Sequence, residues 1–276
     1  MKALRLRTVT GLESNRKALL TYLNSLCTAG PVGEPSDPLY IHLQIDDGRR
    51  DTLLQHVKIL YDAALQHHPE TFVSVVPLTP PTSTLTTSEV TEKQKDTSNS
   101  STASLPLFTS AFMTANRGFE PMYAHVALGG TFDRLHAGHK LLLTTALFYT
   151  NKTLRVGVTL EEMLSKKSHA SYIEPFETRR AAVSNFLRNL RHDIELDVVG
   201  ITEASGGTDR DPSVEALVVS PETAGALVPI NTARASRGLP PLKCIEIPYV
   251  AVGGDDNRIS STELRRRIEE RKRNEK

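Results

Sequence analysis

The sequence has only two cysteines, Cys27 and Cys244, and no long apolar run. Two cysteines cannot build a disulfide scaffold or a multi-cysteine zinc module, and they fit a reducing compartment. Because no run approaches the roughly 20 apolar residues needed to cross a bilayer, we expect no membrane span. The N-terminus lacks an apolar signal core. We therefore expect a cytoplasmic location, with a nuclear one also compatible, and no mitochondrial targeting.

Neither sign of charge is in excess. Lys and Arg number 33, Asp and Glu number 32, and the formal net charge is +1. A chain this neutral has no global attraction to nucleic acid or to an anionic membrane, so any anion site must be built locally. With 276 residues, 39% of them hydrophobic, the chain is long enough for about two modest domains and a sizeable core.

A compositional break divides the chain. Between Thr79 and Ser104, 14 of 26 residues are Ser or Thr and none is aromatic. Such a stretch buries too little apolar surface to offset its ordering entropy, so residues 79–118 are predicted to be a flexible linker, packing loosely toward its end. Residues 1–78 before it read as a small α/β segment of unknown role. An interaction module and an inert folding partner are equally compatible with it.

That N-terminal segment has strand patterns at residues 39–45 and 71–78 and a helix pattern at 51–68. The region after the linker, residues 119–276, alternates strands and helices. It is predicted to be an α/β domain with a mostly parallel sheet covered on both faces. Its five expected strands are 124–130, 153–159, 194–201, 215–220 and 243–250, and its clearest helices are 140–150 and 175–190. Ligands of such sheets bind at the carboxyl ends of the strands.

The strongest motif is GGTFDRLHAGHK, residues 129–140, at the end of the first of these strands. Its glycines allow close approach of backbone to a ligand, and a helix N-terminus favours an anion. His136 and His139, one turn apart, would face the same phosphate. Two other interpretations are ordinary helix-capping histidines and a two-ligand metal site, although the spacing is three rather than four and no Glu follows His136. The dinucleotide fingerprint GxGxxG is absent.

A second motif, ISSTELRRR, occupies residues 259–267. Ser260, Ser261 and Thr262 precede a helix with Arg265 one turn in, which would form a second anion cradle. Taken alone, the motif is better explained as an ordinary N-cap followed by a solvated arginine face.

Together, GTFDxxHxGH and ISSTxxR resemble the double signature of the nucleotidylyltransferase superfamily. The intervening VGVTLEEMLSKK, PFETRRAAVSNFL, DPSVEALVVSPET and INTARASRGLPPL are similar to the eukaryotic and archaeal branch of phosphopantetheine adenylyltransferase. The resemblance covers roughly residues 124–267. LYIHLQ is also similar to the region before the adenylyltransferase part of bifunctional coenzyme A synthase. Because the kinase motif GxxxxGK[ST] is absent, the chain resembles the monofunctional fungal form.

The resemblance implies a Rossmann-like fold and transfer of the adenylyl group of ATP to 4′-phosphopantetheine, giving dephospho-CoA and pyrophosphate in coenzyme A biosynthesis. The expected reaction is a direct in-line attack, with Mg²⁺ bound mainly through ATP and pyrophosphate. Two alternatives are a CTP-dependent cytidylyltransferase for a phosphorylated alcohol and a non-catalytic scaffold. Residues 1–78 are a candidate binding region for other enzymes of coenzyme A biosynthesis, and under the scaffold alternative this binding would be the main role of the chain.

The family pattern also implies residue roles. His139 would stabilise the transition state, with Lys167, or Lys166 beside it, bridging both phosphates. Arg234 is the candidate phosphate clamp, with Arg237 second. ATP would be bound by Gly130, Thr131, Phe132, His136, His139, Glu222, Arg234, Ser260, Ser261, Thr262 and Arg265. Phosphopantetheine would be bound by Thr131, Lys167, Ser220 and Arg237. One departure is EASGG at residues 203–207, where relatives often have an Asp-x-x-Gly-Pro turn. Another is SPET after the fourth strand, in place of a bacterial arginine pair.

Overall fold

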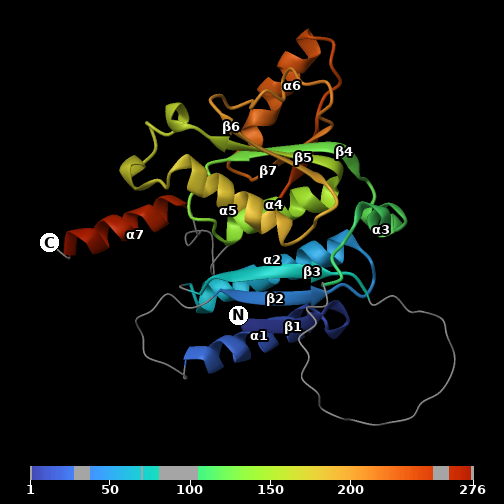
Figure 1. Ribbon diagram of the computed structural model, residues 1–276, viewed down its shortest axis with the longest axis vertical. Coiled ribbons are helices and arrows are strands. Elements are labelled where there is room, and N and C mark those ends of the chain that lie inside the picture. Colours follow the sequence, from blue (N-terminus) through green and yellow to red (C-terminus); the bar gives the residue numbers. More distant parts are fainter. Residues whose placement is uncertain (1, 28–37, 70, 81–104, 251–260, 275–276) are drawn as a thin grey trace.

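The computed structural model describes residues 2–27, 38–69, 71–80, 105–250 and 261–274 (Figure 1). They form an N-terminal unit, residues 2–80, and a C-terminal domain that begins at residue 105. Each is an α/β structure built on its own parallel sheet. None of the described helices is long and apolar enough to cross a membrane.

The C-terminal domain is built on a five-stranded parallel sheet with strand order β6-β5-β4-β7-β8. Its strands are β4 (Tyr123–Gly130), β5 (Thr150–Thr159), β6 (Glu195–Ile201), β7 (Ala216–Val219) and β8 (Lys243–Glu246). The predicted fold class is thereby confirmed. Central parallel strands are covered on both faces, so β4 and β7 are mostly apolar, and β5 is buried mainly from Leu154 onward. The strand order reverses between β4 and β7.

Helices cover both faces of this sheet (Figure 1). The face toward the N-terminal unit carries α4 (Ala137–Tyr149) and α5 (Phe176–Arg188), and the opposite face carries α6 (Leu227–Ser236). The last helix, α7 (Ser261–Asn274), projects from the domain and contacts the turn η4 (Ala170–Tyr172). Two further 3-10 turns are η3 (Glu161–Met163) and η5 (Ala224–Ala226).

The N-terminal unit has a three-stranded parallel sheet of order β1-β2-β3. Its elements are β1 (Lys2–Arg7), η1 (Thr8–Thr10), α1 (Leu12–Cys27), β2 (Leu39–Gln44), α2 (Arg50–His67) and β3 (Val73–Leu78). The expected strands β2 and β3 and the expected helix α2 are confirmed, but β1 and α1 were not predicted. The strand β1 is an edge strand that alternates basic and apolar residues, so it lacks the apolar run that marks a central strand.

The predicted linker is wrong from residue 105 onward, while residues 81–104 lie outside the described part of the chain. Residues 105–118 form α3 (Ser110–Thr114) and lead into η2 (Arg117–Phe119). Phe108, Met113 and Phe119 are at most 1% exposed. The ring of Phe108 lies 5.1 Å from that of Phe148 in α4, centroid to centroid. Burial of these aromatic side chains offsets the entropy lost on ordering residues 105–118. The Ser/Thr-rich composition that predicts a linker ends at residue 104, so the linker prediction extends too far.

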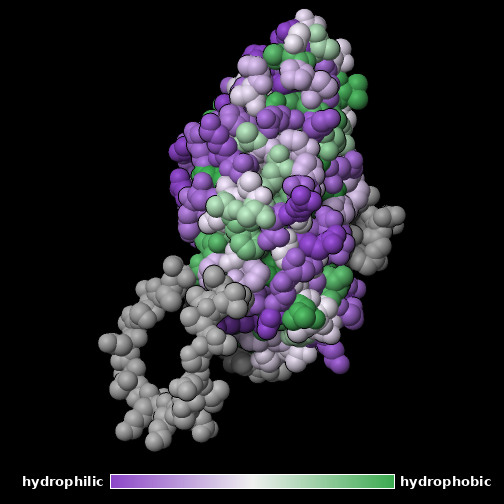
Figure 2. Space-filling model, turned by 90° about the vertical axis from the view of Figure 1, so that its right-hand side faces the viewer, coloured by the Kyte–Doolittle hydropathy of each residue, from purple (hydrophilic) through white to green (hydrophobic). Residues whose placement is uncertain are grey.

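The two units share one hydrophobic core. A single cluster of buried apolar residues runs from Leu6 and Leu19 in the N-terminal unit to Val156 and Leu187 in the C-terminal domain. At its centre α2 packs against α4. Among the described residues, the exposed large apolar side chains are Val9, Phe72, Leu105 and Val228, which lie far apart in the sequence. The described residues on the face in Figure 2 accordingly mix hydrophilic and hydrophobic side chains.

Candidate functional site

A cavity of about 630 Å³ opens at the carboxyl ends of β4 and β7, where the strand order reverses. It is lined by the turn after β4, the first turn of α4, the end of β7, the segment after β8 and the start of α7. This is the position that a parallel sheet favours for a ligand. Both sequence motifs therefore meet at one cavity.

The turn after β4 is a tight loop of backbone against the cavity. A Cβ on Gly130 would lie 3.0 Å from Cζ of Phe132, so a side chain there would displace the buried phenyl ring. Phe132 itself has a φ of 51°, a left-handed conformation that few residues other than glycine adopt. This turn presents Thr131 to the cavity, and Thr159 on the neighbouring strand donates from its Oγ1 to Oγ1 of Thr131 (3.3 Å).

The two histidines lie together at the start of α4. His136 is the N-cap, and its Nδ1 accepts a hydrogen bond from the backbone N–H of His139 (3.4 Å). The two imidazole rings stack, with centroids 3.7 Å apart and planes at 20°. Both rings line the cavity. The three-residue spacing thus places them side by side at a helix N-terminus, as predicted.

Both imidazoles are neutral near pH 7. Burial lowers the pKa of His136 to about 4; Asp133 opposes the shift and Lys140 adds to it. Burial, then the neighbouring His136 and Lys167, hold the pKa of His139 well below its ordinary value. Because Nδ1 of neutral His136 accepts a hydrogen bond, its proton is on Nε2, which makes that atom a donor.

His139 has a buried nitrogen, Nδ1, with no hydrogen-bond partner among the described residues. An unpaired buried polar atom beside a cavity is a natural contact point for a ligand. The alternative two-histidine metal site gains no support, because no group of three His, Cys, Asp or Glu side chains suited to a metal occurs among the described residues.

Both candidate lysines are exposed, and of the two only Lys167 lines the cavity. The charge of Lys167 is close enough to help depress the pKa of His139. The structure therefore brings one of the pair to the histidines.

The start of α7 closes the cavity through Ser261, Thr262 and Arg265, which all line it. Ser261 donates from its Oγ to the carbonyl oxygen of Asp133 (3.0 Å), and Thr262 accepts from Nη2 of Arg265 (3.1 Å). Ser260 lies outside the described residues. The helix that carries the second motif is thus attached directly to the loop that carries the first.

Arg265 is 2% exposed, and its Nη1 forms an ion pair with Oδ2 of the fully buried Asp133 (2.8 Å). The other carboxyl oxygen of Asp133 accepts from the backbone N–H of Glu174 (3.0 Å). Asp133 lies within the first motif but was not singled out from the sequence. Its partners show that it joins the turn after β4 to α7.

Arg179 is a second residue that sequence reasoning missed. Its guanidinium is 1% exposed and donates to the carbonyl oxygens of Thr131 (2.7 Å), Thr159 (3.0 Å) and Glu174 (2.8 Å); Thr131 and Thr159 line the cavity. A sequence signal existed, because Arg179 falls on the same helical stripe as the buried Val183 and Phe186. A basic residue on an apolar stripe indicates an internal role.

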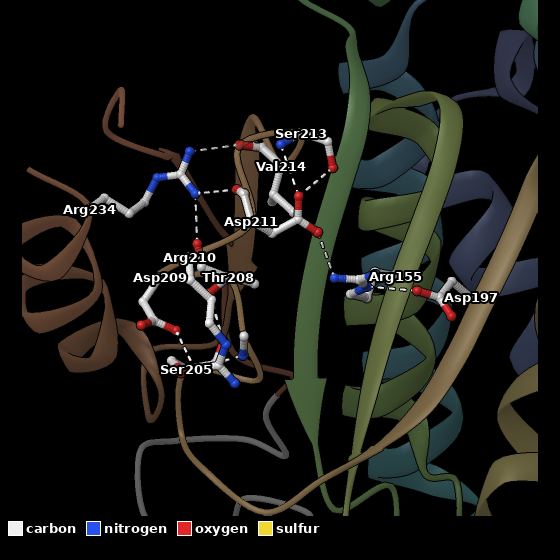
Figure 3. Close-up of polar contacts among 11 residues, drawn as sticks. Arg155, Asp197, Ser205, Thr208, Asp209, Arg210, Asp211, Ser213, Val214 and Arg234 are labelled. Atoms are coloured by element: carbon white, nitrogen blue, oxygen red, sulfur yellow. Dashed lines mark hydrogen bonds and ion pairs between the residues drawn. The ribbon is translucent and has the colours of Figure 1, made fainter. Parts of the chain in front are cut away.

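Ser220 and Glu222, which follow β7, line the cavity as expected, but the two candidate arginines further on do not. Arg234 is 0% exposed, and its guanidinium donates to four backbone carbonyls in two neighbouring loops. Figure 3 shows three of them, those of Thr208, Asp211 and Val214. All of those contacts are internal, so the prediction that Arg234 clamps a phosphate is wrong. It ties α6 to the loop between β6 and β7 instead.

Arg237 is also outside the cavity lining. It is about half exposed and pairs with Asp209 (3.3 Å). The loop it contacts is further fixed at Asp211, whose carboxylate accepts from Arg155 of β5 (2.7 Å; Figure 3). This loop contains the EASGG departure from the family pattern, and its Ala204 reaches the cavity.

Comparison with known proteins agrees with this geometry. The family described as cytidylyltransferase-like matches residues 127–267. A protein of Methanopyrus kandleri named phosphopantetheine adenylyltransferase is 38% identical over 148 residues, which cover 54% of this chain and 92% of that protein. The chain belongs to the cytidylyltransferase-like family, among the phosphopantetheine adenylyltransferases.

Other relatives in this family come from fungi and archaea. A Saccharomyces cerevisiae protein named phosphopantetheine adenylyltransferase is 38% identical over 144 residues, covering 51% of this chain and 47% of that protein. A Pyrococcus abyssi protein of the same name is 40% identical over 145 residues, covering 52% of this chain and 89% of that protein. The chain thus matches only about half the length of its yeast relative.

Proposed function

We propose that this chain transfers the adenylyl group of ATP to 4′-phosphopantetheine, releasing pyrophosphate and forming dephospho-CoA. The observation that carries the proposal is the meeting of both motifs at one cavity. The stacked His136 and His139, Lys167 and the first turn of α7 line the same space at the carboxyl edge of the sheet. The names of the relatives support phosphopantetheine as the acceptor.

The chemistry requires positioning and charge stabilisation rather than a covalent intermediate. An oxygen of the phosphopantetheine phosphate attacks the α-phosphorus of ATP in line. The bond from that phosphorus to the bridging oxygen breaks, and pyrophosphate leaves with the electron pair. Negative charge spreads over the equatorial oxygens of the α-phosphate in the transition state. Preformed donors at those oxygens lower the barrier.

The described residues supply such donors. A neutral imidazole donates one hydrogen bond, so His139 would stabilise the α-phosphate without adding a fixed positive charge, and His136 would donate from Nε2. The N-terminus of α4 adds its free amide groups and the positive end of its dipole. Thr131 would hold the attacking phosphate, with the backbone of Phe132 and Gly130 beside it. Lys167 would bridge the two phosphates.

The remaining lining residues would contact the ends of the substrates. Ser261, Thr262 and Arg265 are proposed to face the β- and γ-phosphates of ATP. Since Nη1 of Arg265 is paired with Asp133, Nη2 donates to Thr262 and Nε donates to Ser168, that arginine would contribute only the N–H groups these contacts leave over. Glu222 would lie against ATP and Ser220 against phosphopantetheine.

Mg²⁺ is proposed to enter as part of the nucleotide substrate. Among the described cavity residues Glu222 is the single carboxylate, and no three-ligand metal cluster is found in the described part of the chain. Mg²⁺ prefers oxygen ligands and is commonly held by substrate phosphates with few protein contacts. The donor set of this cavity fits an ion carried by ATP and does not fit a metal cage made by the protein.

The test is pyrophosphate release by the purified chain with Mg²⁺-ATP, with and without 4′-phosphopantetheine. CTP and nicotinamide mononucleotide serve as competing substrates. Release that requires ATP and phosphopantetheine together is the expected result. Turnover with CTP would indicate a cytidylyltransferase reaction instead. If the folded protein released no pyrophosphate with any substrate pair, the result would support the scaffold alternative.

Site variants sharpen the test. His139→Ala is expected to lower kcat by roughly 100- to 1,000-fold, the usual loss for one transition-state donor. His192→Ala is the control, because His192 is exposed and lies outside the cavity lining. Equal kcat values for the two variants would contradict the role given to His139.

A further inference from the structure

The helix that carries the two histidines is covered by the N-terminal unit, which lies outside the matched family region of residues 127–267. In Figure 1, α2 runs beside α4 on the face turned away from the sheet, and the two helices pack together. This unit therefore contacts the helix that carries the candidate active-site histidines, on the side of that helix turned away from the sheet.

Lys140 makes the connection nearest to the site. It directly follows His139, is 7% exposed, and reaches out of the C-terminal domain into β3. Its Nζ donates to the carbonyl oxygen of Val73 (2.7 Å) and to Oγ of Ser74 (3.0 Å). Both of these acceptors are uncharged, and burial lowers the pKa of Lys140 to about 8. A cation buried without a carboxylate is costly, so it depends strongly on the two acceptors it has.

Arg50 makes a second connection at the other end of α4. It is 2% exposed at the start of α2, and its Nη1 donates to the carbonyl oxygens of Phe119 (2.6 Å), Pro121 (2.8 Å) and Phe148 (3.3 Å). Its guanidinium centre also lies 3.5 Å from the centroid of the Tyr149 ring. The N-terminal unit thus grips α4 at its first turn and at its last residues.

We propose that the N-terminal unit is a brace for α4, and that Lys140, through Val73 and Ser74, is a positioning residue for His136 and His139. The inference rests on the proposed function, because it assigns the brace to the adenylyl-transfer site.

The local geometry explains how the brace would act. The backbone N–H of Lys140 donates to the carbonyl oxygen of His136 (3.0 Å), so Lys140 belongs to the same helical turn as both histidines. A side chain fixed at its tip holds that turn in place. Since a misplacement of about 1 Å at a reacting centre costs up to about 100-fold in rate, freeing this turn should be visible in kcat.

The experiment compares Lys140→Met, Ser74→Ala and the double variant with the wild-type chain. Lys58→Met is the matched control, because Lys58 is a part-exposed lysine of α2 that pairs with Asp62 on the same helix. The readouts are kcat, the KM values for ATP and phosphopantetheine, and amide hydrogen exchange in the first turn of α4.

We expect Lys140→Met to lower kcat about tenfold and to change either KM by less than about threefold. Ser74→Ala should lower kcat about two- to threefold, and exchange in the first turn of α4 should become faster in both variants. Since Ser74 acts through Lys140, the double variant should be no slower than Lys140→Met alone. Lys58→Met should behave as wild type.

Wild-type kcat and exchange in both single variants would overturn the proposal, and so would independent, multiplicative losses in the double variant. If Lys140→Met does not fold, Ser74→Ala decides by the same two readouts. If the wild-type chain releases no pyrophosphate with any substrate pair, the proposed function fails. Unchanged exchange in the Ser74→Ala variant would then overturn the brace separately.

Discussion

Replacing Arg234 with Gln separates the internal role seen in the structure from the phosphate-clamp role that the sequence suggested. Four donor–acceptor distances, 2.6, 2.7, 2.7 and 3.2 Å, connect its guanidinium to the carbonyl oxygens of Thr208, Asp211, Pro240 and Val214. A glutamine amide is shorter and has two N–H groups, so at least two of these buried carbonyls would lose their partner.

Each buried polar group left unpaired costs about 1–3 kcal/mol, so we expect Arg234→Gln to lower the free energy of unfolding by about 3–5 kcal/mol. For a chain of this size that corresponds to a fall in Tm of about 10 °C. Urea and thermal unfolding followed by circular dichroism measure the loss. The matched control is Arg237→Gln, because Arg237 lies three residues away, is about half exposed, and should change stability by less than about 0.5 kcal/mol.

The two roles predict changes in different quantities, the free energy of unfolding and the KM for ATP. An internal tie predicts a large loss of stability and a KM for ATP measured on the folded fraction that stays near the wild-type value. A phosphate clamp predicts wild-type stability with a raised KM for ATP. The second result would refute our assignment of Arg234.

Three further predictions concern the shared core, His136 and Gly138. Deleting residues 1–78 should leave an insoluble or unfolded chain, because the core is shared; a soluble remainder with wild-type near-ultraviolet circular dichroism would contradict this. Between pH 6.5 and about 4 the native His136 is neutral whereas its unfolded imidazole binds a proton, so stability should fall as pH falls through this window; the urea midpoint should track pH, and less so in His136→Gln. Gly138→Ala puts a Cβ 3.2 Å from Cε1 of His136 and should lower kcat about tenfold at nearly unchanged Tm, as measured by pyrophosphate release.

Sequence reading was strongest where one physical pattern dominates. The strands β4 and β7 were found because central strands of a parallel sheet are mostly apolar, whereas the edge strands β6 and β8 also carry charged residues. The histidine pair was found because helical spacing fixes which side chains share a face. Both motifs proved to lie at one cavity because carboxyl ends of parallel strands meet at one edge.

The sequence is ambiguous for basic residues, because an Arg or Lys side chain can point either to solvent or into the protein. An arginine four residues after Ile230 on α6 lies on the buried stripe of that helix, yet only the surrounding loops decide that Arg234 points into the protein. Lys140 shows the same ambiguity, since its acceptors, Val73 and Ser74, are more than 60 residues away in the chain. Partners this distant leave no local pattern. What the sequence does show is a basic residue on an apolar stripe.

The placement of the cations changes how the site would bind phosphates. The guanidinium groups of Arg234 and Arg179 donate to backbone carbonyls inside the protein, and the charge of Arg265 is partly neutralised by Asp133. Lys167 is exposed at the cavity, and the two histidines are neutral donors. Most stabilisation of the transferring phosphate would then come from neutral N–H groups fixed in place rather than from mobile charges. Fixed neutral donors are effective only at the correct position, which is why a brace behind α4 would matter more here than another arginine in front of it.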